Sequence, residues 1–170
     1  MGSETIRQAI EGAVGYLTAN PDEARYRDSH ARATLRQGLV VDVTGPAGEA
    51  LSTDMTTSIG GTASAPSPGW LFRAAAASCV TTLIAMRAAS LDLVLGSLEV
   101  TVDSESDDRG ILGIDPAVPA GPLSVRVAVA IAASGADADQ LRAIARWGIE
   151  HCPVADAMGR QVPVETLIEV

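Results

Sequence analysis

Residues 66–87 read PSPGWLFRAAAASCVTTLIAMR, and this stretch decides the fold. Ser67 is suited to cap a helix, and Pro68 to occupy its first position, where a missing N–H leaves no hydrogen bond unmade. The Ala-rich segment that follows favours helix and carries only two charged residues, both arginines. Because a helix without a polar face belongs inside a fold, the pattern predicts a buried central helix. Cys79, one of two thiols in the chain, lies about three turns from its start.

The composition is that of a globular protein. With 170 residues, 47% of them hydrophobic and 19% charged, the chain can bury a sizeable core as one domain or one subunit of a compact oligomer. The formal net charge of −9 argues against a nucleic-acid phosphate partner. All 12 basic residues are arginines, so Schiff-base chemistry on a lysine is excluded.

The sequence also bears on compartment and cofactors. Arg73 and Arg87 interrupt the longest apolar stretch, so no membrane span is expected. Residues 2–7 are polar and lack an apolar signal region, so the expected location is the cytoplasm, where both cysteines stay reduced. The two cysteines stand far apart and only two histidines are available, so we expect no structural zinc site.

Hydrophobic periodicity predicts the other elements. Before the central helix we expect a helix over Ser3–Leu17, a strand over Ala31–Val43, a turn at 45–48, a return strand over Ala50–Thr57 and a flexible loop at 58–61. After it we expect strands at 97–103 and 123–129 flanking a surface excursion at 103–121, a helix at 137–149, a further turn at 154–158 and a closing strand at 162–170. This order lacks regular βαβ alternation, so the class is α+β, with helices against one face of an antiparallel sheet. Residues 1–30 are expected to form an N-terminal helical extension, and residues 31–170 the main domain.

Cys79 and Cys152 are the strong nucleophiles of the chain. A lone cysteine on a buried helix is often a small hydrophobe, so a packing role for Cys79 stays open. Cys152 precedes Pro153 at a helix end, where the turn that the proline begins can offer backbone N–H groups to a thiolate. One cysteine within a helix and a second at a distant helix end is what a peroxidatic and resolving pair requires.

Polar neighbours of these cysteines have simpler interpretations. His151 stands beside Cys152, but adjacent side chains diverge on regular structure, so we expect a helix-terminal cation or a surface group. Thr81 and Thr82 are expected to bond to backbone carbonyls.

Two motifs resemble the signatures of the OsmC/Ohr superfamily. The segment from Pro66 through the Ala-rich helix to Ser78-Cys79 is similar to the first signature, and Cys152-Pro153-Val154 near the C-terminus is similar to the second. The resemblance covers residues 31–170, the OsmC-like domain. It implies an intertwined homodimer in which antiparallel sheets wrap two long central helices.

The resemblance also implies an activity, the reduction of organic hydroperoxides by thiols. Cys79 would attack the O–O bond as a thiolate and become a sulfenic acid, which Cys152 would convert to a disulfide. An external dithiol, such as a lipoylated protein, would then reduce that disulfide, and the cycle would need no metal or organic cofactor.

The family activates its first cysteine with an arginine from the hairpin, held by a glutamate just ahead of the central helix. Arg36 is the match for this arginine and Arg73 is its competitor, while an ordinary edge-strand role for Arg36 also stays open. The sequence departs from the family at the glutamate, which falls at Gly69 or Trp70. Trp70 is expected either to wall a substrate pocket or to pack in the core.

Two other functions stay open. The missing glutamate favours a ligand-binding or redox-sensing dimer with little peroxidase turnover. A hot-dog-type thioesterase also wraps a sheet around a long helix, but the predicted central helix carries no Asp or Glu to activate water.

Overall fold

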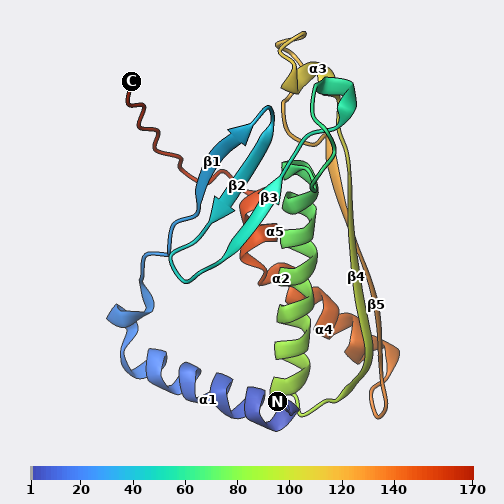
Figure 1. Ribbon diagram of the computed structural model, residues 1–170. Helices are drawn as coiled ribbons and strands as arrows, with labels where there is room; N and C mark the ends of the chain where they lie inside the picture. The colour runs from blue at the N-terminus through green and yellow to red at the C-terminus, as the bar shows by residue number, and fades with distance from the viewer. Residues whose placement is uncertain (1) are drawn as a thin grey trace. The chain divides into compact units, whose positions relative to one another are not determined.

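The computed structural model describes residues 2–170 (Figure 1). They divide into two compact units, which we call the meander unit (residues 13–74) and the thiol unit (residues 2–12 and 75–170). Two helices contribute residues to both units, α1 (Ser3–Ala19) and α2 (Pro68–Ser90).

The meander unit is built on a three-stranded antiparallel sheet in the order β1-β2-β3. Its elements are the 3₁₀ helix η1 (Pro21–Ala24), the strands β1 (Arg32–Gln37), β2 (Val40–Thr44) and β3 (Ala50–Thr53), and the 3₁₀ helix η2 (Thr57–Ile59). The single strand predicted over Ala31–Val43 is wrong, because Gly38 adopts a left-handed φ of +58° and turns the chain between Gln37 and Val40. The predicted turn at 45–48 is confirmed, since the Gly45 N–H donates to the Glu49 carbonyl at 2.9 Å.

Helix α2 begins as its sequence predicts. The Trp70 N–H donates to Ser67 Oγ at 3.2 Å, and Pro68 is the first helical residue. The helix runs to Ser90, one turn beyond the predicted end. Helix α1 is also confirmed, and Arg7 pairs there with Glu4 and Glu11 along one face.

The thiol unit contains a long two-stranded antiparallel ribbon with helices packed on one face (Figure 1). Its elements are β4 (Leu95–Glu105), α3 (Asp108–Ile111), β5 (Ser124–Ala133), α4 (Ala138–Glu150) and α5 (Pro153–Gly159). The inward side chains alternate as predicted, with Leu98 and Val100 on β4 and Val127 and Val129 on β5 packed against the core. Asp137 caps α4 by accepting from the Gln140 N–H at 2.8 Å.

The core of the thiol unit lies where α4 crosses α2. It consists of the buried side chains Val80, Ile84, Ala88, Ile144 and Cys152. Gly148 permits this crossing, because a Cβ built on it would lie 2.4 Å from Ile84 Cγ1 and 2.9 Å from Ile84 N. Residue 148 must therefore be a glycine for the two helices to approach this closely.

Two expectations about burial need correction. The strand predicted at 162–170 is absent from the described chain, and its side chains are exposed, Leu167 by 83%. An extended segment needs a neighbouring strand to satisfy its backbone, and residues 161–170 have none among the described elements. The central helix is buried only along one stripe, formed by Ala76, Val80, Ile84, Ala88 and Ala89.

Helix α2 remains strongly apolar on its other sides. The two arginines were expected to prevent this helix from qualifying as a membrane span. With 23 residues and a mean hydropathy of 1.4, it is nevertheless long and apolar enough to cross a membrane, by length and composition alone. The core helix of a soluble protein has the same properties, and the buried stripe of α2 does pack against α4.

Candidate active site: two thiols in contact

The thiol unit brings together the two cysteines singled out in the sequence. Cys79 lies in the middle of α2, and Cys152 lies between α4 and α5. Cys152 is fully buried, and Cys79 packs against the same core cluster while remaining partly exposed. Both the Cys152 thiol and the Val154 N–H act on the pKa of Cys79, which packs against the core cluster that contains Cys152. Residues 73 positions apart in the sequence (79 and 152) are thus neighbours in the fold.

The turn that carries Cys152 is held by backbone groups. Helix α4 ends at Glu150 with His151 as its C-cap, and the Cys152 N–H donates to the Ile149 carbonyl at 3.3 Å. Pro153 then begins α5, and the Ala155 N–H donates to Cys152 Sγ at 3.4 Å. The sequence-based expectation that this turn offers backbone N–H groups to sulfur is confirmed, and the turn serves both thiols.

The environment of Cys79 favours the neutral thiol. Burial raises the pKa of Cys79, and the neighbouring Cys152 thiol raises it further, while the Val154 N–H opposes both effects. These surroundings therefore favour the protonated thiol over the thiolate. A reactive thiolate at this position requires a positive charge beyond the groups that set this pKa.

His151 does not approach Cys152 as a base. Its ring stacks on Trp147, with the ring centroids 4.0 Å apart and the planes 15° from parallel, and its Nδ1 lies 2.8 Å from the Trp147 carbonyl oxygen. The Arg87 guanidinium lies 5.1 Å from the centre of the Trp147 ring. The expectation of an exposed, helix-terminal histidine is confirmed, while its aromatic partner was not foreseen. Thr81 and Thr82 bond to carbonyls one turn back in α2, as predicted.

Arg36, the predicted activating arginine, lies in the meander unit at an irregularity of β1, where the pairing shifts between Leu35 and Gln37. Arg36 Nε donates to Asp42 Oδ2 at 2.9 Å, and Nη2 donates to Ser52 Oγ at 3.1 Å. This pairing raises the pKa of Arg36 and lowers that of Asp42. Arg36 is exposed on its sheet, and its assignment to Cys79 stays a prediction.

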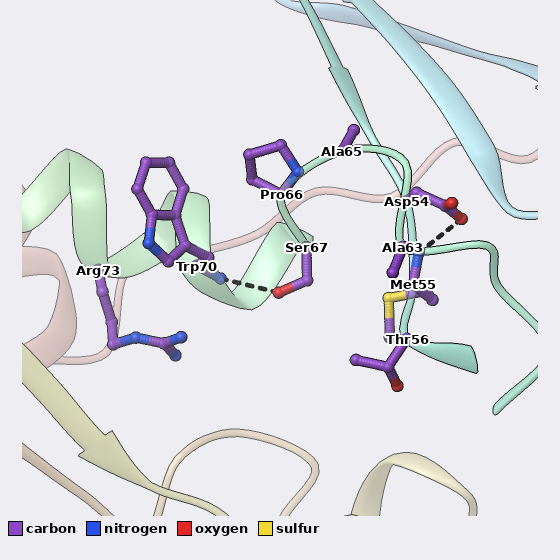
Figure 2. A pocket seen from close by; sticks show the side chains of 9 residues that line it. All are labelled: Asp54, Met55, Thr56, Ala63, Ala65, Pro66, Ser67, Trp70 and Arg73. Atoms are coloured by element: carbon purple, nitrogen blue, oxygen red, sulfur yellow. Dashed lines mark hydrogen bonds between the residues drawn. The ribbon is translucent and has the colours of Figure 1, made fainter. Parts of the chain in front are cut away.

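Trp70 and Arg73, on the first turns of α2, line a pocket of about 390 Å³ within the meander unit (Figure 2). Met55, Ala65 and Pro66 add apolar surface to the same pocket. Trp70 is 50% exposed, so its role is not core packing.

Asp54 organises the loop beside this pocket, and sequence reasoning missed it. The carboxylate is buried and accepts hydrogen bonds from the Met55, Thr62 and Ser64 N–H groups and from the Thr62 and Ser64 hydroxyls, at 2.6–3.0 Å. These bonds, led by the one from the Thr62 hydroxyl, hold the pKa of Asp54 well below its usual range. A Cβ on Gly61 would lie 2.0 Å from the Met55 carbonyl oxygen, so the loop closes tightly on itself. An aspartate at a strand end followed by a Ser/Thr/Gly-rich run is the available signal.

The described residues contain no cluster of His, Cys, Asp and Glu arranged to hold a metal ion. The two sulfur atoms of Cys79 and Cys152, which pack in one core cluster, are the reactive groups that the site offers.

Comparison with known proteins places this site in a family. Residues 61–167 match the family of OsmC-like proteins. The matched range contains both cysteines and the whole of α2. No curated protein matches the sequence. Among solved structures, a putative osmotic stress induced and detoxification response protein from Psychrobacter arcticus is 19% identical, with a TM-score of 0.62 over 78% of this chain and 90% of that one.

Two further structures share the fold. An organic hydroperoxide resistance protein OsmC from Legionella pneumophila is 22% identical, with a TM-score of 0.56 over 79% of this chain and 90% of that one. An OsmC-like protein from Mycoplasma pneumoniae is 12% identical, with a TM-score of 0.66 over 79% of this chain and 89% of that one. The α+β fold expected from the sequence is confirmed, and the chain belongs to the OsmC-like family, whose members include organic hydroperoxide resistance proteins.

Proposed function

We propose that this protein reduces organic hydroperoxides by a two-cysteine cycle. The observation that carries the proposal is the contact between Cys79 and Cys152 inside the thiol unit. A structural pair of small hydrophobes does not need its two sulfur atoms to face one another, whereas disulfide formation does.

Each sulfur has one role in the cycle. Cys79, the more exposed of the two, attacks the O–O bond, releases the alcohol and becomes a sulfenic acid. Cys152 condenses with that sulfenic acid, forming the disulfide and releasing water. An external dithiol then restores both thiols, and a lipoylated protein is the reductant that we propose.

Activation of Cys79 requires a cation, because its surroundings raise the pKa of the thiol. We propose Arg36 for this role. The carboxylate that steadies the guanidinium is then Asp42, on the adjacent strand, in place of the glutamate missing at Gly69 or Trp70. The test measures the pKa of Cys79 from the pH dependence of its alkylation rate. This pKa is expected to rise in Arg36→Ala and to stay unchanged in Arg32→Ala, an arginine of the same strand. A rise in Arg73→Ala alone would transfer the role to Arg73.

The cycle is tested by mixing the reduced protein with cumene hydroperoxide and analysing it by non-reducing mass spectrometry. We expect an intramolecular Cys79–Cys152 disulfide, and multiple turnovers when dihydrolipoamide is supplied. Cys79→Ser is expected to abolish turnover, and Cys152→Ser to stop at oxidised Cys79. If both thiols of the wild type survive excess peroxide unchanged, the proposal is wrong.

A redox-sensing or ligand-binding role is the second candidate, and the raised pKa of Cys79 favours it. A sensor of this kind would form the same disulfide slowly and once, without turnover in the presence of dithiol. The turnover number with dihydrolipoamide therefore separates the two functions.

We also propose that the protein is a homodimer located in the cytoplasm. The apolar side chains at 162–170 are exposed, as are the sides of α2 away from its buried stripe. A second copy is able to cover both surfaces and to supply a strand for the C-terminal segment.

A further inference from the structure

The end of α4 is fastened to α2 by three side chains that the two-cysteine cycle does not use. Trp147 stacks on His151 and receives Arg87 of α2 against its ring, as described above. His151 also contacts the Trp147 carbonyl oxygen through Nδ1, which closes the last turn of α4 on itself. We call these residues the ring cluster.

The ring cluster is linked to both thiols through the chain. His151 immediately precedes Cys152 and ends α4. Trp147 precedes Gly148, the residue in closest approach to Ile84 of α2. Arg87 lies on α2 itself, about two turns beyond Cys79. The cluster thus joins the helix that carries the first thiol to the turn that carries the second.

The two cysteines are free thiols packed in one cluster, and formation of the disulfide requires their sulfur atoms to close to about 2.05 Å. Cys152 has little freedom of its own, because its N–H, its carbonyl and its sulfur are all engaged in the turn. The placement of the turn as a whole therefore decides how often Cys152 reaches Cys79.

We propose that Trp147 and His151 are positioning residues for the resolving step of the proposed cycle, with Arg87 holding Trp147 against α2. The inference rests on the proposed function. In this step Cys79–SOH and Cys152–SH give the disulfide and water, so two sulfur atoms are joined and one oxygen leaves with two protons. The competing reaction is Cys79–SOH with a second hydroperoxide, which gives the sulfinic acid and an alcohol. When Cys152 is held close to Cys79 the disulfide is the main product, and when its turn is loosened more Cys79 sulfinic acid forms.

The competition provides a readout that a purely structural role would not move. The reduced protein is titrated with cumene hydroperoxide, and mass spectrometry measures the fractions of disulfide and of Cys79 sulfinic acid. The peroxide concentration that gives equal amounts of disulfide and sulfinic acid equals the first-order rate constant of resolution divided by the second-order rate constant of overoxidation. Because it is a ratio measured on Cys79–SOH, it does not depend on how fast Cys79 first reacts.

His151→Ala is the informative variant because the side chain is exposed, so its removal leaves the core intact. We expect the equal-product peroxide concentration to fall about three- to tenfold, the range for losing one aromatic pair, with the first oxidation of Cys79 unchanged within twofold. His151→Phe keeps the ring and is expected to stay within twofold of the wild type. His30→Ala, at the other histidine of the chain, is the matched control and is expected to behave as wild type. Trp147→Leu should repeat the effect of His151→Ala.

The outcomes separate the two proposals. An unchanged product ratio in both His151→Ala and Trp147→Leu, with disulfide still forming, overturns the positioning role alone. A fall in His151→Phe equal to that in His151→Ala also overturns it, because the ring would then not be the cause. Absence of disulfide in the wild type and in His30→Ala would instead refute the proposed cycle.

Discussion

Gly148→Ala tests the closest helix crossing in the thiol unit. The added Cβ would lie 2.4 Å from Ile84 Cγ1, 2.9 Å from Ile84 N and 3.1 Å from Ile84 Cα. The side-chain atom could turn away, but the two backbone atoms cannot, so α4 must move off α2. Even with the side chain turned away, bringing the nearest backbone atom, Ile84 N, to an ordinary contact of 3.4 Å requires a shift of about 0.5 Å.

The magnitude is a difference between two opposing effects. Overpacking of this kind costs about 1–3 kcal/mol, and backbone contact places this site toward the upper end. Alanine regains about 1 kcal/mol of helix propensity over glycine. We therefore expect Gly148→Ala to lower the free energy of unfolding by about 1–2 kcal/mol. Since Cys152 follows directly on α4, disulfide formation should slow as well.

The assay is urea unfolding at a fixed protein concentration, because association would add to the apparent stability. Gly12→Ala in α1 is the matched control: nothing lies within 4 Å of its added Cβ, and it should raise the stability by about 0.5–1 kcal/mol. The two substitutions are chemically the same and are predicted to have opposite signs. If Gly148→Ala is as stable as Gly12→Ala, the close crossing is not a constraint and the packing argument is wrong.

Three further predictions concern charge and association. Asp54→Asn should lower the urea midpoint of unfolding at neutral pH. Because the folded pKa of Asp54 is depressed, the carboxylate stabilises the fold above its unfolded pKa of about 3.9, and the difference in urea midpoint between variant and wild type should narrow as the pH falls below that value. A difference in midpoint that does not change with pH would exclude the ionised carboxylate as its source. Burial and the Cys152 thiol raise the folded pKa of Cys79, so in Arg36→Ala, where the proposed activating cation is removed, the contribution of Cys79 to stability is present below the unfolded pKa of about 8.5 and is lost as the pH rises through the folded pKa. The double variant Arg36→Ala/Cys79→Ala should lack this alkaline loss, and an identical pH profile in the two variants would contradict the raised pKa. Deleting residues 161–170 should shift sedimentation from dimer toward monomer if this exposed apolar segment pairs with a second copy, and an unchanged dimer would refute that pairing.

Local signals in the sequence were enough to predict most elements. Ser67 and Pro68 fixed the start of α2, because capping depends on neighbours within four residues. Strict alternation predicted β4 and β5, although both extend beyond the predicted ends. The turn at Gly38 is hard to predict because an apolar run at 39–41 follows it directly, and a two-residue turn leaves little trace in composition.

The missed features depend on contacts distant in the sequence. The five donors on Asp54 come from residues 55, 62 and 64, and only the folded loop shows that they converge. The stacking of Trp147 on His151 follows helical spacing and could have been proposed, but the approach of Arg87 could not. The contact of the two thiols was a requirement of the family resemblance rather than a deduction from spacing. The predicted C-terminal strand failed because alternation marks a segment able to pair and does not supply a partner.

The Asp54 loop has a consequence for how this chain tolerates changes in length. The Asp54 N–H donates to the Pro66 carbonyl at 3.3 Å, which closes residues 54–66 into a loop of fixed length that ends directly ahead of α2. An inserted residue at 55–64 would separate donors from the single carboxylate they share and would misdirect the first turn of the helix. The largely exposed segment at 111–118 is not organised around a single buried carboxylate in this way. Insertions and engineered tags should therefore be tolerated at 111–118 and not in the Asp54 loop.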